Sequence, residues 1–136
     1  MIKIEKLKNH SNNVRLDVLN QTMAAGKGHI GGTFSCIEIL VSLYMGGVLN
    51  FKPTNPSWKY RDRFILSKGH ACLALYSIFR KLGVISSDLY NSYGKDGGLG
   101  GQLDISIPGV DFNTGSLGHS IGVAAGMALG AKMDNE

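Results

Sequence analysis

The chain has 136 residues, enough for one domain and too few for two. Hydrophobic residues make up 43% and charged residues 18%, a balance that excludes an intrinsically disordered chain. The net charge of +4 comes from scattered basic residues without a run of five like charges or interleaved aromatic residues, which argues against a nucleic-acid-binding surface.

The first element expected is a helix over residues 2–25. Val14, Val18, Leu19 and Met23 fall on roughly one side of it, as in an amphipathic helix. The N-terminus lacks the continuous apolar segment of a signal peptide, and no stretch of about 18 residues is apolar enough to span a bilayer. We therefore expect a cytoplasmic protein that does not bind membranes.

A second helix is predicted after the glycines at 26–32. Ser35 and Glu38 match the S-x-x-E capping box, in which each side chain satisfies a backbone N–H group at the helix start. Apolar residues then follow at helical spacing, at Ile37, Leu40, Val41 and Tyr44. The pair Gly46-Gly47 ends this helix.

Residues 50–58 contain two prolines and are expected to be irregular. The densest cluster of basic residues begins in this segment. We interpret most of these side chains as a solvated basic face and expect fewer of them to favour an anionic substrate or cofactor. The cluster consists of Lys52, Lys59, Arg61 and Arg63. The run Arg63–Ser67 predicts a short buried strand that ends in a glycine turn.

From that turn a helix departs with Leu75, Phe79 and Leu82 on one face. Strand, glycine turn and helix in this order are typical of a parallel α/β unit. Cys36 and Cys72 both lie in apolar helical patterns and lack the spacing of a zinc site, so we expect buried free thiols in a reducing compartment.

The last third of the chain is rich in glycine. A short helix is expected from Ser87 to Tyr93, with Ser86 or Ser87 as its cap, and residues 94–101 hold five glycines and form a loop. The final helix is predicted over residues 116–133. Its glycines recur every fourth position, which favours close packing against another backbone; they are Gly118, Gly122, Gly126 and Gly130.

Three of the four histidines lie in glycine-bearing turns, each next to a predicted helix start: Gly28-His29-Ile30-Gly31-Gly32, Ser67-Lys68-Gly69-His70-Ala71 and Gly115-Ser116-Leu117-Gly118-His119. Helix starts present unpaired N–H groups that attract anions, and imidazoles exchange protons near neutral pH. If the fold brings these turns together, they form a pocket for a phosphate-bearing ligand.

The order of these motifs resembles the N-terminal, thiamine diphosphate-binding domain of transketolases, above all the type split into separate N- and C-terminal subunits. The resemblance covers nearly the whole chain, and its further motifs are Glu38-Ile39-Leu40, Asp62-Arg63-Phe64-Ile65-Leu66 before the second turn, and Pro108-Gly109-Val110-Asp111 with Thr114 before the third. It implies an α/β fold in which helices flank a parallel sheet, with residues 1–136 as its N-terminal part and the C-terminal side incomplete.

The resemblance also implies the chemistry. In transketolases the thiazolium carbanion of thiamine diphosphate attacks a ketose phosphate, and a two-carbon ketol unit passes to an aldose. His29 and His70 would line the channel at the reactive carbon as catalytic residues, and His70 would also lie near the diphosphate. Gly115 would offer its backbone to the aminopyrimidine of the cofactor, Leu117 would pack against the rings, and Ser116 would be a further cofactor-binding residue. His29 and Gln102 would bind substrate.

Two positions depart from the family pattern. Gln102 stands where many transketolases carry a substrate-facing histidine, and glutamine cannot carry a proton at neutral pH. Ser120 stands where the family usually has glycine.

The family's Gly-Asp-Gly metal motif is not found in this sequence, so we expect no Mg²⁺ ligands here and poor binding of the cofactor by the isolated chain.

Three interpretations follow. The chain is part of a transketolase that requires the missing segments and a pyrimidine-binding partner such as a C-terminal subunit, within a homo- or hetero-oligomer that acts on small sugar phosphates. Alternatively, it is a non-catalytic fragment or interaction module of that family. The third interpretation is a free-standing binder of a phosphate-bearing ligand, which the order of the motifs disfavours.

Overall fold

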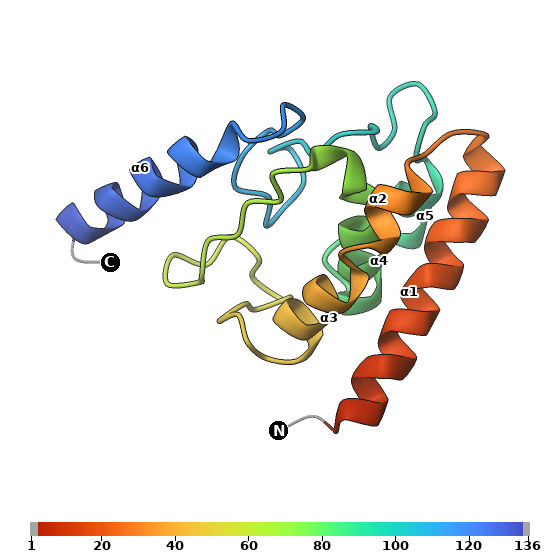
Figure 1. The fold of residues 1–136 in the computed structure, drawn as a ribbon, viewed down its shortest axis with the longest axis horizontal. Helices are drawn as coiled ribbons and strands as arrows, with labels where there is room; N and C mark the ends of the chain where they lie inside the picture. The colour runs from red at the N-terminus through yellow and green to blue at the C-terminus, as the bar shows by residue number, and fades with distance from the viewer. Residues whose placement is uncertain (1–2, 135–136) are drawn as a thin grey trace.

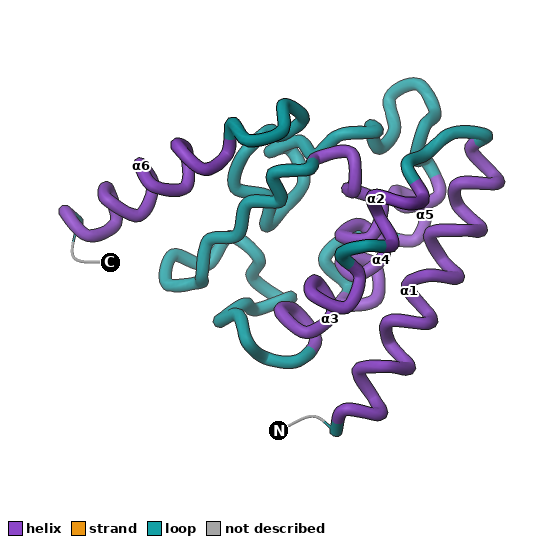
Figure 2. Tube along the Cα trace, viewed as in Figure 1, coloured by secondary structure: helices purple, strands orange, loops and turns teal. Residues whose placement is uncertain are grey.

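The computed structural model describes residues 3–134, and every regular element in that range is helical (Figures 1 and 2). The elements are α1 (Ile4–Ala25), α2 (Ile30–Phe34), α3 (Ile37–Met45), the 3₁₀ turn η1 (Gly69–Ala71), α4 (Cys72–Leu82), α5 (Ser87–Asn91) and α6 (Ser120–Met133). No helix in the described range is both long and apolar enough to cross a membrane.

The core lies between α1, α3 and α4, which pack against one another. Val14 and Val18 on α1 are completely buried, as predicted. Leu19 and Met23 were expected on the same side, but 38% and 72% of their surface is exposed. The buried stripe of α1 instead includes the polar residues Ser11 and Gln21, which a pattern based on apolar residues alone does not select.

The second predicted helix corresponds to α3, while the short helix α2 before it was not predicted, and the expected capping box is wrong. Ser35 ends α2 rather than starting α3, and its hydroxyl donates to the carbonyl oxygen of Gly32 at 2.9 Å. The carboxylate of Glu38 pairs with Arg15 of α1. The predicted apolar face of α3 is confirmed, because its four residues, Ile37, Leu40, Val41 and Tyr44, are buried.

The predicted strand at Arg63–Ser67 does not form, since these residues have no regular secondary structure, and residues 3–134 contain no sheet. A strand needs a neighbour for its backbone N–H and C=O groups. Here the N–H group of Phe64 donates to the carboxylate of Asp111 at 3.0 Å instead. The parallel sheet expected from the sequence is therefore not confirmed by the described part of the chain.

The helices α4 and α5 follow the sequence closely. Leu75 and Phe79 are buried on α4, and Leu82 is packed against the core. Ser86 caps α5, because its hydroxyl accepts a hydrogen bond from the N–H group of Leu89 at 3.0 Å. Of the two serines considered as the cap, the structure selects the first.

The last helix, α6, begins at Ser120, four residues later than predicted, and extends away from the other helices (Figure 1). Ser120 is its only buried residue in the described range. A β-carbon added to Gly122, Gly126 or Gly130 would touch nothing within 4 Å. The predicted close packing of this glycine stripe is therefore not made within residues 3–134.

Candidate active site

Two of the histidines meet at the junction of α2 and η1. His29 immediately precedes α2, and His70 lies in η1. Their ring centroids are 5.2 Å apart with the ring planes tilted by 58°. His29 is exposed and His70 half-buried, so both imidazoles belong to one surface region. The predicted convergence of these two turns is confirmed.

Glycines allow the turns to approach this closely. The ring of His70 lies over Gly32 of α2, where an added β-carbon would be 3.2 Å from Nε2. On the other side of the turn, a β-carbon on Gly69 would lie 2.4 Å from the carbonyl oxygen of Thr114. A side chain at position 69 would thus collide with backbone, which fixes glycine there.

The contact with Thr114 brings the third turn to the same region. A β-carbon on Gly115 would lie 3.5 Å from Oε1 of Gln102, so these two predicted site residues are neighbours. The hydroxyl of Tyr76 on α4 donates to the carbonyl oxygen of Gln102 at 3.0 Å and anchors the glycine-rich loop. A cavity of about 550 Å³ lies along this loop, and Tyr76, Gln102 and Thr114 are among the residues that line it.

The remaining residues of the third turn face solvent. Gly115 and Ser116 are exposed, and Leu117 exposes 69% of its surface. His119 does not join the other two histidines in a ring contact within the described chain. Its ring packs instead against Phe112 at a centroid distance of 5.8 Å. The convergence therefore includes the backbone of all three turns but the imidazoles of only two.

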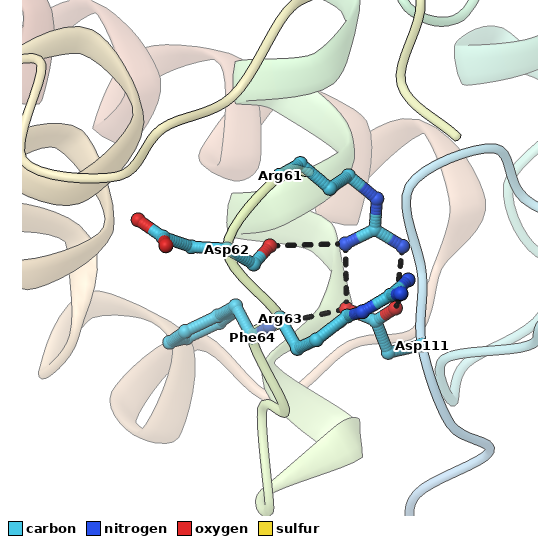
Figure 3. A network of polar contacts seen from close by, with 5 residues as sticks. All are labelled: Arg61, Asp62, Arg63, Phe64 and Asp111. Carbon is cyan, nitrogen blue, oxygen red and sulfur yellow. Dashed lines mark hydrogen bonds and ion pairs between the residues drawn. The ribbon is translucent and has the colours of Figure 1, made fainter. Parts of the chain in front are cut away.

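A buried ion pair holds the loop that leads into the third turn (Figure 3). The guanidinium of Arg61 makes two hydrogen bonds to the carboxylate of Asp111, one of them 2.8 Å long, and both side chains are at least 94% buried. The same carboxylate accepts the N–H group of Phe64 and lies 3.8 Å from Arg63. These hydrogen bonds raise the pKa of Arg61 against the opposing effect of burial.

The ion pair corrects the interpretation of the basic cluster. Arg61 was grouped with residues of a solvated basic face, but it is buried and neutralised by Asp111. Lys52 is exposed, and its ammonium lies 3.5 Å from the centroid of the Trp58 ring. The four residues therefore do not form one uniform cationic surface.

Cys36 and Cys72 are buried free thiols, as predicted. Burial raises the pKa of Cys72 to about 12, and its thiol donates to the carbonyl oxygen of Gly100 at 3.7 Å. Burial also raises the pKa of Cys36 above its ordinary value. Neither thiol is prepared to act as a nucleophile near neutral pH.

The residues of this region suit an organic ligand better than a metal ion. The paired imidazoles of His29 and His70 can hydrogen-bond an anionic group, and the exposed side chain of Leu117 offers an apolar surface to an aromatic ring. A metal ion needs several donors at one point, and residues 3–134 hold no group of three or more His, Cys, Asp and Glu side chains that could bind one.

Comparison with known proteins identifies the family. The family described as "Transketolase, thiamine diphosphate binding domain" matches residues 7–136. The chain belongs to this family.

Individual proteins to which the chain is similar are transketolases or transketolase subunits. The chain is 39% identical to an apulose-4-phosphate transketolase subunit of Phocaeicola vulgatus over 98% of its own length and 47% of the relative's. It is 37% identical to a 6-deoxy-6-sulfo-D-fructose transketolase subunit of a Clostridium species, over 95% of its own length and 47% of the relative's. The transketolase structure from Campylobacter jejuni superposes with a TM-score of 0.88 at 31% identity, over 96% of this chain and 21% of that one. The chain thus shares its fold with part of a transketolase and spans about half the length of these subunits.

Proposed function

We propose that this chain is part of a transketolase, which transfers a two-carbon ketol unit from a ketose phosphate to an aldose phosphate. The observation that supports this most directly is the contact between His29, just before α2, and His70 in η1, in a chain of a thiamine diphosphate-binding family. A single histidine at a helix start has many structural uses, whereas a paired, accessible set beside glycine turns is suited to proton transfer.

In this proposal each residue of the site has its own role. His29 and His70 hydrogen-bond substrate hydroxyls and move protons, and His70 also lies near the diphosphate. Gln102 holds a substrate oxygen without exchanging a proton, because its amide does not titrate. Gly115 offers its backbone to the aminopyrimidine, Leu117 packs against the rings of the cofactor, and Ser116 is a further cofactor-binding residue. Bound thiamine diphosphate supplies the nucleophile for cleavage of the carbon–carbon bond.

The metal ligands and the missing sheet come, in this proposal, from other segments. Arg63, Ile65 and Ser67 line one wall of an open groove of about 410 Å³, and one face of α6 lines the other. A strand placed in this groove would pair with residues 63–67 and cover α6, which would create the parallel sheet. Mg²⁺ would then be bound by residues of the added segment.

A partner subunit is also part of the proposal. Two similar proteins are named as transketolase subunits, and the chain covers about half of each. We infer that a second polypeptide supplies the pyrimidine-binding domain and that the two form an oligomer.

A cytoplasmic location is supported by the two free, buried cysteines, which suit a reducing compartment.

The decisive experiment assembles the chain with the complementary segments of its diphosphate domain and with the pyrimidine-binding partner. Ketol transfer should appear, and His29→Ala or His70→Ala should lower kcat by roughly 10²- to 10⁴-fold, the usual contribution of a proton-transferring side chain. His10→Ala on α1 is the matched control and should leave the rate unchanged. Assembly without ketol transfer would instead support a non-catalytic module.

Cofactor binding by the chain alone gives a second test. A ligand that binds only the folded state raises stability by about 2.7 kcal/mol at 100 times its Kd. We expect little or no rise in Tm with thiamine diphosphate and Mg²⁺, since the metal ligands lie elsewhere. A rise of several degrees would contradict that part of the proposal.

A further inference from the structure

Lys68 links the two histidine-bearing turns through a closed set of three polar contacts. It lies directly before η1, on the same turn as His70, and its side chain reaches across to α2. Its ammonium donates to the carbonyl oxygen of Gly32 at 2.8 Å and to the hydroxyl of Ser35 at 2.6 Å. The hydroxyl of Ser35 in turn donates to the same Gly32 carbonyl at 2.9 Å.

The Gly32 carbonyl is open to side chains because of how α2 ends. The N–H group four residues ahead belongs to Cys36, and it donates to the carbonyl of Thr33 instead of Gly32. Carbonyls at a helix end carry partial negative charge and favour a cation. Hydrogen bonds from an ammonium are roughly twice as strong as neutral ones, so Lys68 is a well-matched donor here.

Gly32 is also the surface on which the ring of His70 rests. A β-carbon at this glycine would be 3.2 Å from Nε2 and 3.3 Å from Cδ2 of that ring. The turn that carries Lys68 and His70 therefore meets Gly32 in two ways: Lys68 binds its carbonyl oxygen, and the ring of His70 occupies the space next to the position of a β-carbon. His29 stands at the start of the same helix, so a shift of α2 would change its distance from His70.

We propose that Lys68 is a positioning residue that holds α2 against η1 and thereby sets the separation of the His29 and His70 rings. The proposal rests on the proposed transketolase function for its catalytic consequence, but the geometric effect stands apart from it. Lys68 acts through the two histidines and Gly32, and its ammonium makes no ion pair with a carboxylate in the described part of the chain.

The geometric effect can be measured by NMR on the 136-residue chain with labelled histidines. Lys68→Met should move the ring signals of His29 and His70 and abolish the nuclear Overhauser effect between them, while the signals of His10 on α1 stay in place. Lys68→Arg keeps a cationic donor and should restore at least part of that effect. Unchanged signals of both histidines in Lys68→Met would overturn the proposal.

If Lys68→Met does not fold, a variant that keeps the ammonium group of Lys68 tests the same contact. Ser35→Ala removes one of the two acceptors of Lys68 and leaves its charge in place. We expect the same two histidine signals to move, by less than in Lys68→Met. If circular dichroism shows a folded Ser35→Ala chain whose histidine signals have not moved, the proposal is wrong.

The assembled enzyme separates positioning from binding. A misplacement of about 1 Å can cost 10²-fold in rate, so Lys68→Met should lower kcat by roughly 10- to 100-fold. The Kd for thiamine diphosphate with Mg²⁺ should change less than about threefold. A raised Kd with an intact kcat at saturation would make Lys68 a cofactor ligand and overturn its positioning role. If the wild-type assembly transfers no ketol units, the proposed function fails while the NMR result still decides the role of Lys68.

Discussion

The body formed by α1, α3 and α4 and the outlying helix α6 are both rich in apolar residues, yet they differ in burial. On α3 and α4, Ile37, Tyr76 and Phe79 are almost completely buried. On α6, Ile121 and Leu129 expose 76% and 61% of their surface. Apolar composition thus shows what a helix can bury, and only its neighbours decide what it does bury. Most of the chain's stability should reside in the body.

The largest expected effect tests this division directly. Phe79 is fully buried and packs against Tyr44 and Phe51, with ring centroids 5.5 and 5.8 Å away. Phe79→Ala should cost about 3–5 kcal/mol, the usual loss when a core aromatic ring is removed. Urea denaturation followed by circular dichroism measures it. Leu129→Ala on α6 is the control and should change stability by less than about 0.5 kcal/mol; equal losses would mean that the two regions unfold as one unit.

The connection between the two regions is the next target. Asp111→Asn keeps the size of the side chain but leaves the buried Arg61 guanidinium without its counter-charge. An unpaired buried charge is expensive, so we expect a loss of about 3 kcal/mol in the free energy of unfolding. Glu5→Gln is the matched control, since the ion pair of Glu5 with Lys8 is exposed and 4.0 Å long. An Asp111→Asn chain as stable as wild type would show that the ion pair contributes nothing to stability.

A smaller effect within the body depends on pH. Burial alone would raise the pKa of Asp17, but hydrogen bonds from Lys81, Ser77 and Arg80 outweigh it and lower the pKa below its ordinary value of 3.8. A lowered folded-state pKa stabilises the fold above that value, and the stabilisation is lost as the pH falls through the folded-state pKa. Asp17→Asn should therefore cost about 1 kcal/mol at pH 7, since the site is partly exposed.

The pH dependence provides the check on that prediction. The stability difference between wild type and Asp17→Asn should shrink as the pH is lowered below about 4, because the wild-type carboxylate then takes up its proton. Asp96→Asn in the exposed glycine-rich loop should change stability by less than about 0.5 kcal/mol at any pH in this range. A difference that stays constant down to pH 2 would contradict the assignment of Asp17 as the titrating group.

The sequence predicted the helices well because their signals are local. The apolar spacing of α3 and α4 and the serine cap of α5 each depend on residues within one or two turns. The strand at 63–67 could not be judged in the same way, since a strand exists only when a distant segment pairs with it. The capping box failed for a related reason: α2 precedes α3 so closely that Ser35 ends one helix rather than starting the next.

The candidate site was predictable in part. The turns of His29 and His70 were recognised through their glycines and through the family resemblance, and the structure brings them together. The imidazole of His119 was expected to join them and packs against Phe112 instead. Arg61 and Asp111 lie 50 residues apart, and no spacing rule links them in a single sequence. Such long-range polar contacts follow from the fold and carry no local signal.

The smallest expected effect sharpens the comparison at α6. Gly126 has helical surroundings and open space where a β-carbon would go, so Gly126→Ala should stabilise the isolated chain by up to about 1 kcal/mol through helix propensity alone. If the glycine stripe is the face on which another segment packs, the added methyl group should weaken assembly with the complementary segments. Ala125→Gly is the matched control and should destabilise the isolated chain. Unchanged assembly in Gly126→Ala would assign these glycines no packing role, leaving the groove between α6 and residues 63–67 as the surface to be covered.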